Sequence, residues 1–243
     1  MNLSLFIFLI CFFKMTICSQ LNHEDYFIIR QVGQGLWTTR VLNDSCEHFD
    51  FGGEIFQARK LKQQFISQCF NKLNILHLSH AHMDHYAFLG LIAQNSKSIC
   101  WGSRPPEYLK NNQTQIPFCK KLGDGQIIYF NDEPLNKNDR SIIMQMNEFL
   151  MPGDSSSKIE KIWSLKLKDD HFEIKYLVLG HHGSRTATSE LLIHHLPNLK
   201  MAFASARFQV YRHPDAVVIK RLRDHLVPVI KTEDWGDIKI NRF

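Results

Sequence analysis

The sequence has no run of about 20 consecutive apolar residues, the length that a helix needs to cross a bilayer. A membrane channel is therefore not expected. The chain also has no long block of Lys or Arg, so its formal net charge of +5 permits a polyanionic partner without requiring one. No Gly/Ser-rich linker, low-complexity segment or short repeat divides the 243 residues, of which 44% are hydrophobic. Such a length and composition predict one well-filled domain.

The N-terminal segment is apolar but short. Residues 3–13 are too few to span a membrane, and they have the length of the hydrophobic part of a secretory signal. We therefore expect a signal peptide over residues 1–19, a folded domain over residues 20–243, and a secreted or periplasmic protein. No Lys or Arg precedes the run, and Lys14 interrupts its end. An N-terminal anchor, a start placed too early and a lipoprotein signal ending at Cys18 are the alternatives.

Four of the six cysteines follow the expected signal peptide, at positions 46, 69, 100 and 119. An even number fits disulfide bonds in an oxidising compartment, and free buried cysteines are an equally good interpretation. No Cys-x-x-Cys pair occurs, so a structural zinc site is not expected.

Two β-rich runs, each relieved by helices, fill the rest of the chain. Apolar runs bounded by turn residues predict strands at 26–32, 37–42, 46–51, 73–78, 98–101, 126–130, 142–146, 149–151, 172–179, 201–206, 227–231 and 237–241. Helical spacing predicts helices at 54–70, 156–167, 188–196 and 215–225. The simplest architecture is two half-domains whose sheets pack face to face with helices outside, an α+β fold.

Four potential metal ligands follow the apolar strand at 73–78: His80, His82, Asp84 and His85. Imidazole and carboxylate together suit Zn²⁺ and neighbouring first-row ions. Two ions about 3.5–4 Å apart are a common device for hydrolysing phosphate esters. The alternative is a group of surface histidines in a chain that has 13 of them, but four ligands directly after a strand are hard to obtain by chance.

Further reactive side chains stand at the ends of later strands. Asp154 lies in a Gly-Asp turn, and His181 and His182 follow the strand at 172–179. Ligand sites gather at such strand ends. A carboxylate such as Asp154 can bridge two cations, and a later histidine can complete the ligand set of the second ion. A plain turn aspartate is an equally good interpretation of Asp154 alone.

With these residues in place, the span from Tyr26 to Asn241 resembles the metallo-β-lactamase superfamily. More narrowly, it resembles the hydrolase domain of the ComEC-type competence proteins of DNA uptake. The motifs that carry the resemblance occur in the family's order: Val32–Gly35, Phe49–Gly53, His80–His85, Asn138–Ile143, Pro152–Asp154, Gly180–Ser184, His213–Asp215 and Lys231–Asp234.

The resemblance implies an αββα sandwich with a dinuclear centre of Zn²⁺ or Mn²⁺ that acts on phosphodiesters, with DNA as the expected partner. Carried over to this chain, it implies that His80 and His82 hold one ion and that Asp84 and His85 hold the other. Asp154 would bridge the two ions. One of His181 and His182 would be the last ligand, and His182 is favoured.

The same resemblance implies further roles. Asp84, His181 and His213 would be the catalytic residues, with His181 beside the leaving group and His213 as a proton donor or substrate contact. Ser184, Asn138 and Ser141 would bind the substrate or its phosphate, and Asp50 would orient a ligand.

The chain departs from the family's pattern at two points. Leu36 stands where the group usually has Asp, and the superfamily's third-motif histidine has no clear match, since Asn138 or Ser141 falls in its region. Three hypotheses follow: a metal-dependent phosphodiesterase or nuclease, a metallo-hydrolase of another ester or amide, and a DNA-binding protein with a weakened metal centre. His194 and His195 lie in an expected amphipathic helix and are interpreted as surface residues.

Overall fold

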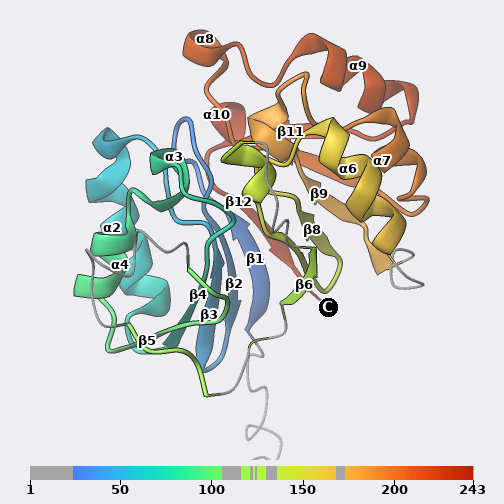
Figure 1. Ribbon diagram of the computed structural model, residues 1–243. Coiled ribbons are helices and arrows are strands. Elements are labelled where there is room, and N and C mark those ends of the chain that lie inside the picture. The colour runs from blue at the N-terminus through green and yellow to red at the C-terminus, as the bar shows by residue number, and fades with distance from the viewer. Residues whose placement is uncertain are drawn as a thin grey trace, which may run out of the picture.

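The computed structural model describes residues 24–105, 116–120, 123, 125–129, 136–167 and 173–242. The expected signal peptide over residues 1–19 lies outside these ranges. The described residues form two six-stranded sheets that pack against each other, with helices on the two outer faces (Figure 1). This four-layer arrangement confirms the predicted α+β sandwich.

The first sheet has the strand order β12-β1-β2-β3-β4-β5. It is mixed, because β3, β4 and β5 run parallel while the other neighbours run antiparallel. Its strands are β1 (Asp25–Ile29), β2 (Thr38–Leu42), β3 (Ser45–Phe49), β4 (Leu73–His77), β5 (Ser98–Trp101) and β12 (Ile238–Asn241). The last strand of the chain thus returns to the first sheet, where Ile238 pairs with Ile29.

The second sheet has the order β11-β10-β9-β8-β7-β6 and is also mixed. Its strands are β6 (Gln126–Tyr129), β7 (Ile143–Met146), β8 (Phe149–Met151), β9 (Tyr176–Val178), β10 (Met201–Ala204) and β11 (Val229–Lys231). Each predicted strand has a counterpart, and the structure shortens several of them. β9, for example, has three residues where the sequence predicts eight, 172–179.

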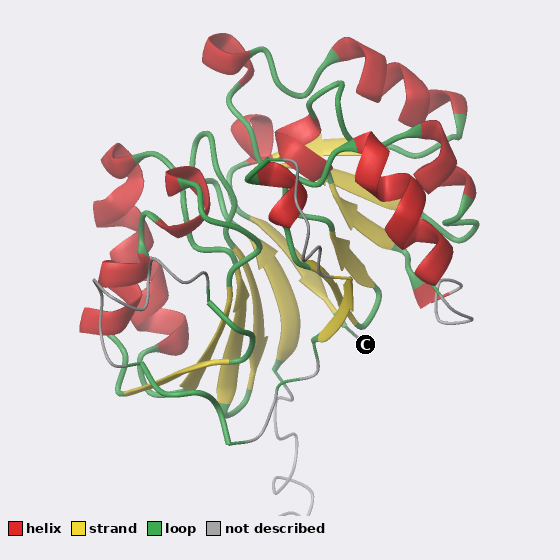
Figure 2. Ribbon diagram, in the orientation of Figure 1, coloured by secondary structure: helices red, strands yellow, loops and turns green. Residues whose placement is uncertain are grey.

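Helices cover the outer face of each sheet, as Figure 2 shows in red. Those beside the first sheet are η1 (Ile55–Gln57), α2 (Ala58–Cys69), α3 (Met83–Tyr86) and α4 (Leu89–Gln94). Those of the second half are η2 (Asn138–Arg140), α6 (Ser157–Trp163), η3 (Ser164–Lys166), η5 (Gly180–Gly183), α7 (Glu190–His194), α8 (Phe208–Tyr211), α9 (Ala216–Asp224) and α10 (Thr232–Trp235).

Three apolar layers hold these elements together. The layer between the sheets includes Phe27 of β1 and Phe149 of β8, whose rings stack with centroids 4.0 Å apart. One outer layer packs α2 and α4 on the first sheet, with Trp37 and Phe65 fully buried. The other packs α6, α7 and α9 on the second sheet around Trp163. The loops at the strand ends are therefore carried by a packed frame.

Two disulfide bonds decide between the alternatives that the sequence left open. Cys46 of β3 is bonded to Cys69 at the end of α2, and Cys100 of β5 is bonded to Cys119. The first bond fixes an outer helix to its sheet. In the part of the chain that the structure describes, no helix is both long and apolar enough to cross a membrane.

Candidate metal centre

The first four candidate ligands lie on the loop that leaves β4 and on the short helix α3. His82 stands at the N-cap of α3, and Asp84 and His85 lie in its only full turn. The backbone of this turn is fixed from outside, because Leu36 N donates to Asp84 O (3.0 Å) and Phe51 N donates to His85 O (2.8 Å). These bonds position α3 from the loops that precede β2 and follow β3.

Glycines allow this close approach of three backbones. A Cβ atom on Gly52 would lie 2.2 Å from the carbonyl carbon and oxygen of Asp84. One on Gly35 would lie 2.6 Å from the same oxygen. Only a residue without a side chain fits at such contacts. The glycines of the two motifs at 32–35 and 49–53 therefore set the place of the ligand turn.

The second half of the chain supplies the remaining ligands from two strand ends. Asp154 follows β8 through Gly153, which has a φ of +55°. His181 and His182 follow β9 with φ values of +49° and +56°. Residues other than glycine rarely adopt such a left-handed backbone conformation. Where they do, the surrounding structure holds them in it, and such residues cluster at functional sites. The strained turn directs both imidazoles toward Asp154.

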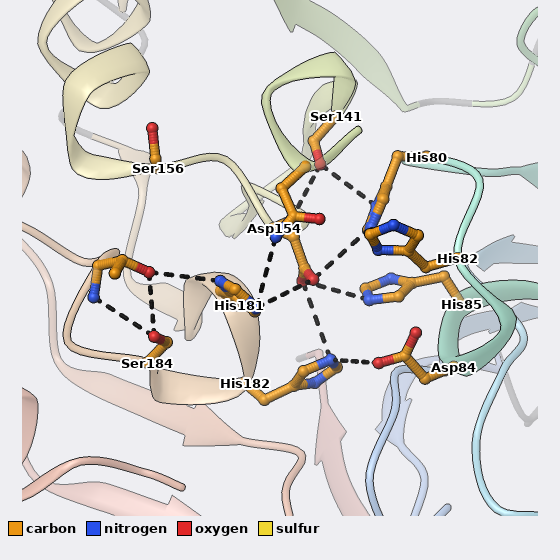
Figure 3. A network of polar contacts seen from close by, with 12 residues as sticks. His80, His82, Asp84, His85, Ser141, Asp154, Ser156, His181, His182 and Ser184 are labelled. Atoms are coloured by element: carbon orange, nitrogen blue, oxygen red, sulfur yellow. Dashed lines mark hydrogen bonds and ion pairs between the residues drawn. The ribbon is translucent and has the colours of Figure 1, made fainter. Parts of the chain in front are cut away.

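Asp154 is the centre of the cluster (Figure 3). Its Oδ1 lies 3.2 Å from His85 Nε2 and 3.9 Å from His182 Nε2. Its Oδ2 lies 3.6 Å from His80 Nε2 and 3.7 Å from His181 Nε2. Each carboxylate oxygen thus faces two imidazoles, the arrangement that a bridging ligand requires.

This cluster contains two triads whose ligand atoms all lie within 4.8 Å of one another: His80, His85 and Asp154 form one, and Asp84, His85 and His182 form the other. His182 Nε2 is 3.1 Å from Asp84 Oδ2. His82 belongs to neither triad; its Nδ1 lies 3.0 Å from His80 Nε2. The six predicted ligands are therefore gathered in one place, but His85 is shared between the triads instead of pairing with Asp84 alone.

This donor set fits a pair of divalent cations. His85 Nε2 and Asp154 Oδ1 are buried and make no hydrogen bond among the described residues, although they face each other. Buried polar atoms without partners are rare, and a metal ion is one explanation for them. Imidazole nitrogen with carboxylate oxygen suits Zn²⁺ and Mn²⁺ alike, so the residues do not decide between these two metals.

The charges of the cluster support the same interpretation. Burial would raise the pKa of Asp154, but the neighbouring His85 and His182 outweigh it and hold the pKa well below its usual range. Burial would also raise the pKa of Asp84, but the hydrogen bond from His182 and the charges of His85 and His182 together outweigh it and lower the pKa. Burial holds the pKa of His80 well below its ordinary value. Ionised carboxylates and neutral imidazoles are the states that bind a metal. Burial would lower the pKa of His85, but the carboxylates of Asp154 and Asp50 outweigh it and raise the pKa well above its ordinary value, so a metal ion there would displace a proton.

Asp50 lies behind the ligands, at the end of β3. Its carboxylate accepts hydrogen bonds from the backbone N–H and the hydroxyl of Ser79, at 2.7 and 2.8 Å. Its Oδ2 also lies 2.7 Å from His85 Nδ1, so the Nε2 atom of His85 points into the cluster. Ser205 O performs the same task for His182, whose Nδ1 lies 3.1 Å away. Such partners fix the orientation of metal-binding imidazoles.

Ser141 and Asn138 lie beside the cluster. Ser141 Oγ accepts from Asp154 N at 3.0 Å and lies 3.3 Å from His80 Nδ1, so it supports two ligands from within the protein. Asn138 Nδ2 is 3.5 Å from His181 Nε2. The structure therefore places Ser141 next to His80, in the region where the family's third-motif histidine is expected.

Ser184 and His213 lie one step farther out. Ser184 Oγ is 3.0 Å from Thr186 Oγ1, which in turn lies 3.4 Å from His181 Nδ1. The rings of His213 and His181 have centroids 6.2 Å apart, and His213 Nδ1 is buried without a hydrogen bond among the described residues. The structure thus gathers His181, His213 and Ser184 on one side of Asp154.

Sequence reasoning missed several supporting residues. Ser79 and Thr186 each lie one or two residues from a recognised motif residue, and that proximity was the available signal. Ser205 acts through its backbone carbonyl, which a sequence pattern does not reveal. Leu36 is buried in the layer between the sheets, 4% exposed, and only its backbone N–H reaches the site.

No protein-family model matches the chain. Two curated proteins match part of it. Recombination protein 2 of Haemophilus influenzae is 32% identical over 97 residues, which cover 40% of this chain and 12% of that protein. ComE operon protein 3 of Bacillus subtilis is 28% identical over 109 residues, which cover 44% of this chain and 14% of that protein. The matched segments are thus a small part of both relatives.

Solved structures resemble the whole fold. The metallo-β-lactamase fold protein YhfI from Bacillus subtilis aligns with a TM-score of 0.55 at 12% identity, over 90% of this chain and all of that one. A diphosphatase of the PhnP family aligns with a TM-score of 0.56 at 10% identity, over 90% of this chain and 98% of that one.

The β-hydroxylase CmlA aligns with a TM-score of 0.52 at 10% identity, over 90% of this chain and 54% of that one. Likeness at such identities shows the fold and leaves the reaction open, since the neighbours include a diphosphatase and a hydroxylase. The sheet order, the helix layers and these neighbours show that the chain is a metallo-β-lactamase fold protein, and the curated relatives support its resemblance to ComEC-type proteins.

Proposed function

We propose that the chain is a metal-dependent hydrolase of phosphodiesters, with DNA as its substrate class. The observation that carries this proposal is the carboxylate of Asp154, each of whose oxygens faces two imidazoles. The names of the two curated relatives, one a recombination protein and the other a product of a ComE operon, support DNA as the substrate. The diphosphatase among the structural neighbours supports chemistry at phosphorus on this fold.

The metal ligands in this proposal are His80, His82 and Asp154 for one ion and Asp84, His85, His182 and the shared Asp154 for the other. Bound divalent cations would supply Lewis acidity at the attacked phosphorus and the positive charge that makes water a better nucleophile. The protein's own part is to hold these side chains in a fixed geometry. Asp50 does so for His85 by holding its Nδ1 atom.

His181 is the proposed acid or oxyanion stabiliser beside the leaving group. Its side chain is 30% exposed, so a substrate can reach it, and its Nε2 atom is near Asp154. Burial lowers the pKa of His181, with the positive charges of the neighbouring histidines acting in the same direction. A neutral imidazole at neutral pH can hydrogen-bond an oxygen that gains negative charge. His213, with a pKa likewise lowered by burial, is the proposed second contact.

Ser184, Asn138 and Ser141 are proposed to bind the substrate or to support its phosphate. Ser184 and Asn138 lie on the same side of the cluster as His181. Ser141 Oγ instead accepts a hydrogen bond from Asp154 N and lies next to His80. Its proposed role is therefore to hold these two ligands in place.

A second candidate is a DNA-binding protein with a weakened metal centre. The observation that favours it is Ser141, which lies beside His80 where the family's third-motif histidine is expected. A hydroxyl is a weaker ligand for Zn²⁺ than an imidazole. A third candidate, hydrolysis of another ester or amide, has no observation of its own in the structure.

Export is also a proposal. The two disulfide bonds support it, because disulfides persist in oxidising compartments. The site of any signal cleavage lies outside the described residues.

The test is hydrolysis by the full chain. Linear single- and double-stranded DNA and the small ester bis-p-nitrophenyl phosphate are incubated in EDTA, Zn²⁺, Mn²⁺ and Mg²⁺. We expect cleavage that needs a metal and is lost in His82→Ala and Asp154→Ala. His194→Ala is the matched control, since this histidine lies on α7 with an exposed side chain and is expected to keep full activity.

The outcomes separate the candidates. Cleavage of the small ester without any cleavage of DNA would move the substrate to another ester. DNA affinity without metal-dependent hydrolysis of either substrate would favour the binding protein.

A further inference from the structure

A pocket of about 610 Å³ opens beside the metal centre, and its lining includes the ligand residue Asp84. One wall comes from the first half of the chain, with Ile55 and Phe56 of η1 and Met83 of α3. Tyr211 of α8 lines it from the second half. Helices α3 and α8 lie at the same end of the molecule in Figure 1. Any substrate held at Asp84 therefore has this pocket as its immediate surroundings.

Several residues that line the pocket have apolar side chains and are nevertheless exposed to solvent. Ile55 and Phe56 are both 64% exposed, Met83 is 58% exposed and Tyr211 is 46% exposed. Phe208 and Val210, which precede Tyr211 in α8, are also exposed. Apolar side chains that gather on one surface next to a reactive site indicate a binding site.

The polar floor of the pocket is already ordered. Glu54 accepts hydrogen bonds from Gln34 N (3.1 Å) and from Arg207 Nη1 (2.8 Å). Arg207 N donates to Gln34 Oε1 at 3.2 Å, which closes the network. The guanidinium of Arg207 lies 5.4 Å from the centre of the Phe56 ring. This network links the two halves of the chain beside the pocket and places the ion-paired guanidinium of Arg207 against the Phe56 ring.

An arginine also lies beside the aromatic ring of Phe208 in α8. The guanidinium of Arg212 lies 5.7 Å from the ring of Phe208. Aromatic faces with Arg nearby are the surfaces on which unstacked bases lie, while the positive charge attracts the phosphate backbone. Bases in a duplex are stacked on one another and are not free to contact such walls.

We propose that the pocket formed by Phe56, Met83 and Tyr211 binds an unpaired base of a single-stranded nucleic acid next to the phosphodiester at the metal centre. This inference rests on the proposed function and deepens it, because it assigns the preferred substrate as single-stranded. Phe56 and Tyr211 supply the aromatic surface on which a base can stack, and the guanidinium of Arg207, ion-paired with Glu54, lies beside the Phe56 ring.

The test measures binding apart from hydrolysis. The full chain is titrated in EDTA against a fluorescent oligothymidylate and against a duplex of the same length, and affinity is read from fluorescence anisotropy. Phe56→Ala and Tyr211→Ala are expected to weaken single-strand affinity by about tenfold each, as for the loss of one base-stacking contact. Tyr211→Phe keeps the ring and is expected to retain the affinity.

Phe118→Ala is the matched control. The exposed fraction of Phe118 is 60%, similar to that of Phe56. Phe118 forms a β-bridge with Trp101 of β5 and is not among the residues that line the pocket. Its removal is expected to leave affinity unchanged. Thermal unfolding of each variant shows that the loss of affinity does not reflect loss of fold.

The outcomes also separate this inference from the proposed function. No single-strand affinity in the parent chain, equal affinity for duplex, or unchanged affinity in Phe56→Ala and Tyr211→Ala would each overturn the inference, whether or not hydrolysis occurs. Weakened binding in both variants without metal-dependent hydrolysis would support the pocket and refute the hydrolase.

Discussion

Replacement of Gly52 by alanine tests whether the glycine loops position the metal ligands. Gly52 follows β3 and has an ordinary backbone conformation, so alanine is disfavoured there only by contact. Its Cβ atom would lie 2.2 Å from the carbonyl group of Asp84, whereas ordinary contacts begin at 3.4 Å. The two backbones must therefore separate by about 1.2 Å, the difference between these distances.

That displacement acts on Asp84 and His85, whose backbones adjoin Gly52. A misplacement of about 1 Å in a catalytic group can cost about 100-fold in rate. We expect Gly52→Ala to lose activity on bis-p-nitrophenyl phosphate by about that factor and to bind metal more weakly. Overpacking of this kind is expected to lower the free energy of unfolding by about 1–3 kcal/mol.

The assay pairs hydrolysis and metal titration with chemical denaturation. Gly90→Ala is the control, because a Cβ atom at Gly90 in α4 meets nothing within 4 Å. This control is expected to keep activity and metal affinity, with a gain of about 0.5–1 kcal/mol in stability from removing a helical glycine. If Gly52→Ala binds metal and hydrolyses the ester as the parent does, the reasoning about backbone contact is refuted.

Three further predictions concern single side chains. Asp50→Asn removes the charge that holds His85 and is expected to weaken metal affinity by about 10- to 100-fold in a chelator competition, whereas Asp44→Asn on an exposed turn leaves it unchanged; equal effects would contradict the account. His181→Gly removes the imidazole, so hydrolysis is expected to fall. It also relieves a left-handed backbone conformation, so the free energy of unfolding is expected to stay within about 1 kcal/mol of the parent's. A large loss of stability would argue that His181 has a structural role. Burial raises the pKa of Glu160 above its ordinary 4.5 against two backbone hydrogen bonds, so the folded state holds this proton more tightly than the unfolded state. The excess stability of the parent over Glu160→Gln should therefore shrink as pH rises above 4.5 through the raised pKa, and an excess that grows in urea denaturation would contradict the assignment.

Much of the fold could be predicted because the local signals agree. Strands β1 to β4 follow apolar runs that end in glycine or turn residues, and α2 and α9 follow helical spacing. The pairing of β12 with β1 could not be predicted, because it joins Ile238 to Ile29 across more than 200 residues. The only contribution of the sequence there was a strand with alternating apolar residues.

The candidate site was predictable as a set of residues but not as a geometry. His80, His82, Asp84 and His85 are adjacent in the chain, so their common location followed from the motif. Their pairing with Asp154 and His182 depends on how the loops of two sheets approach each other. That approach depends on contacts such as those of Gly52, which no pattern of ligands reveals.

The aromatic pocket had the weakest signal in the sequence. Tyr211 lies between a predicted strand and a predicted helix, in a segment without clear periodicity. Phe56 fits the helical spacing of residues 54–70, and that pattern predicts burial. In the structure Phe56 lies on η1 at the start of that segment, and its side chain is exposed.

The measurement that tests the central claim most directly is the metal content of the purified chain at equilibrium with Zn²⁺ or Mn²⁺. If Asp154 bridges a dinuclear centre, the parent binds two ions per chain, and Asp154→Asn loses affinity for both. Asp44→Asn, on an exposed turn, keeps both ions. One ion or none in the parent, or an Asp154→Asn variant that retains two ions with the parent's affinity, would contradict the dinuclear centre on which the proposed hydrolysis depends.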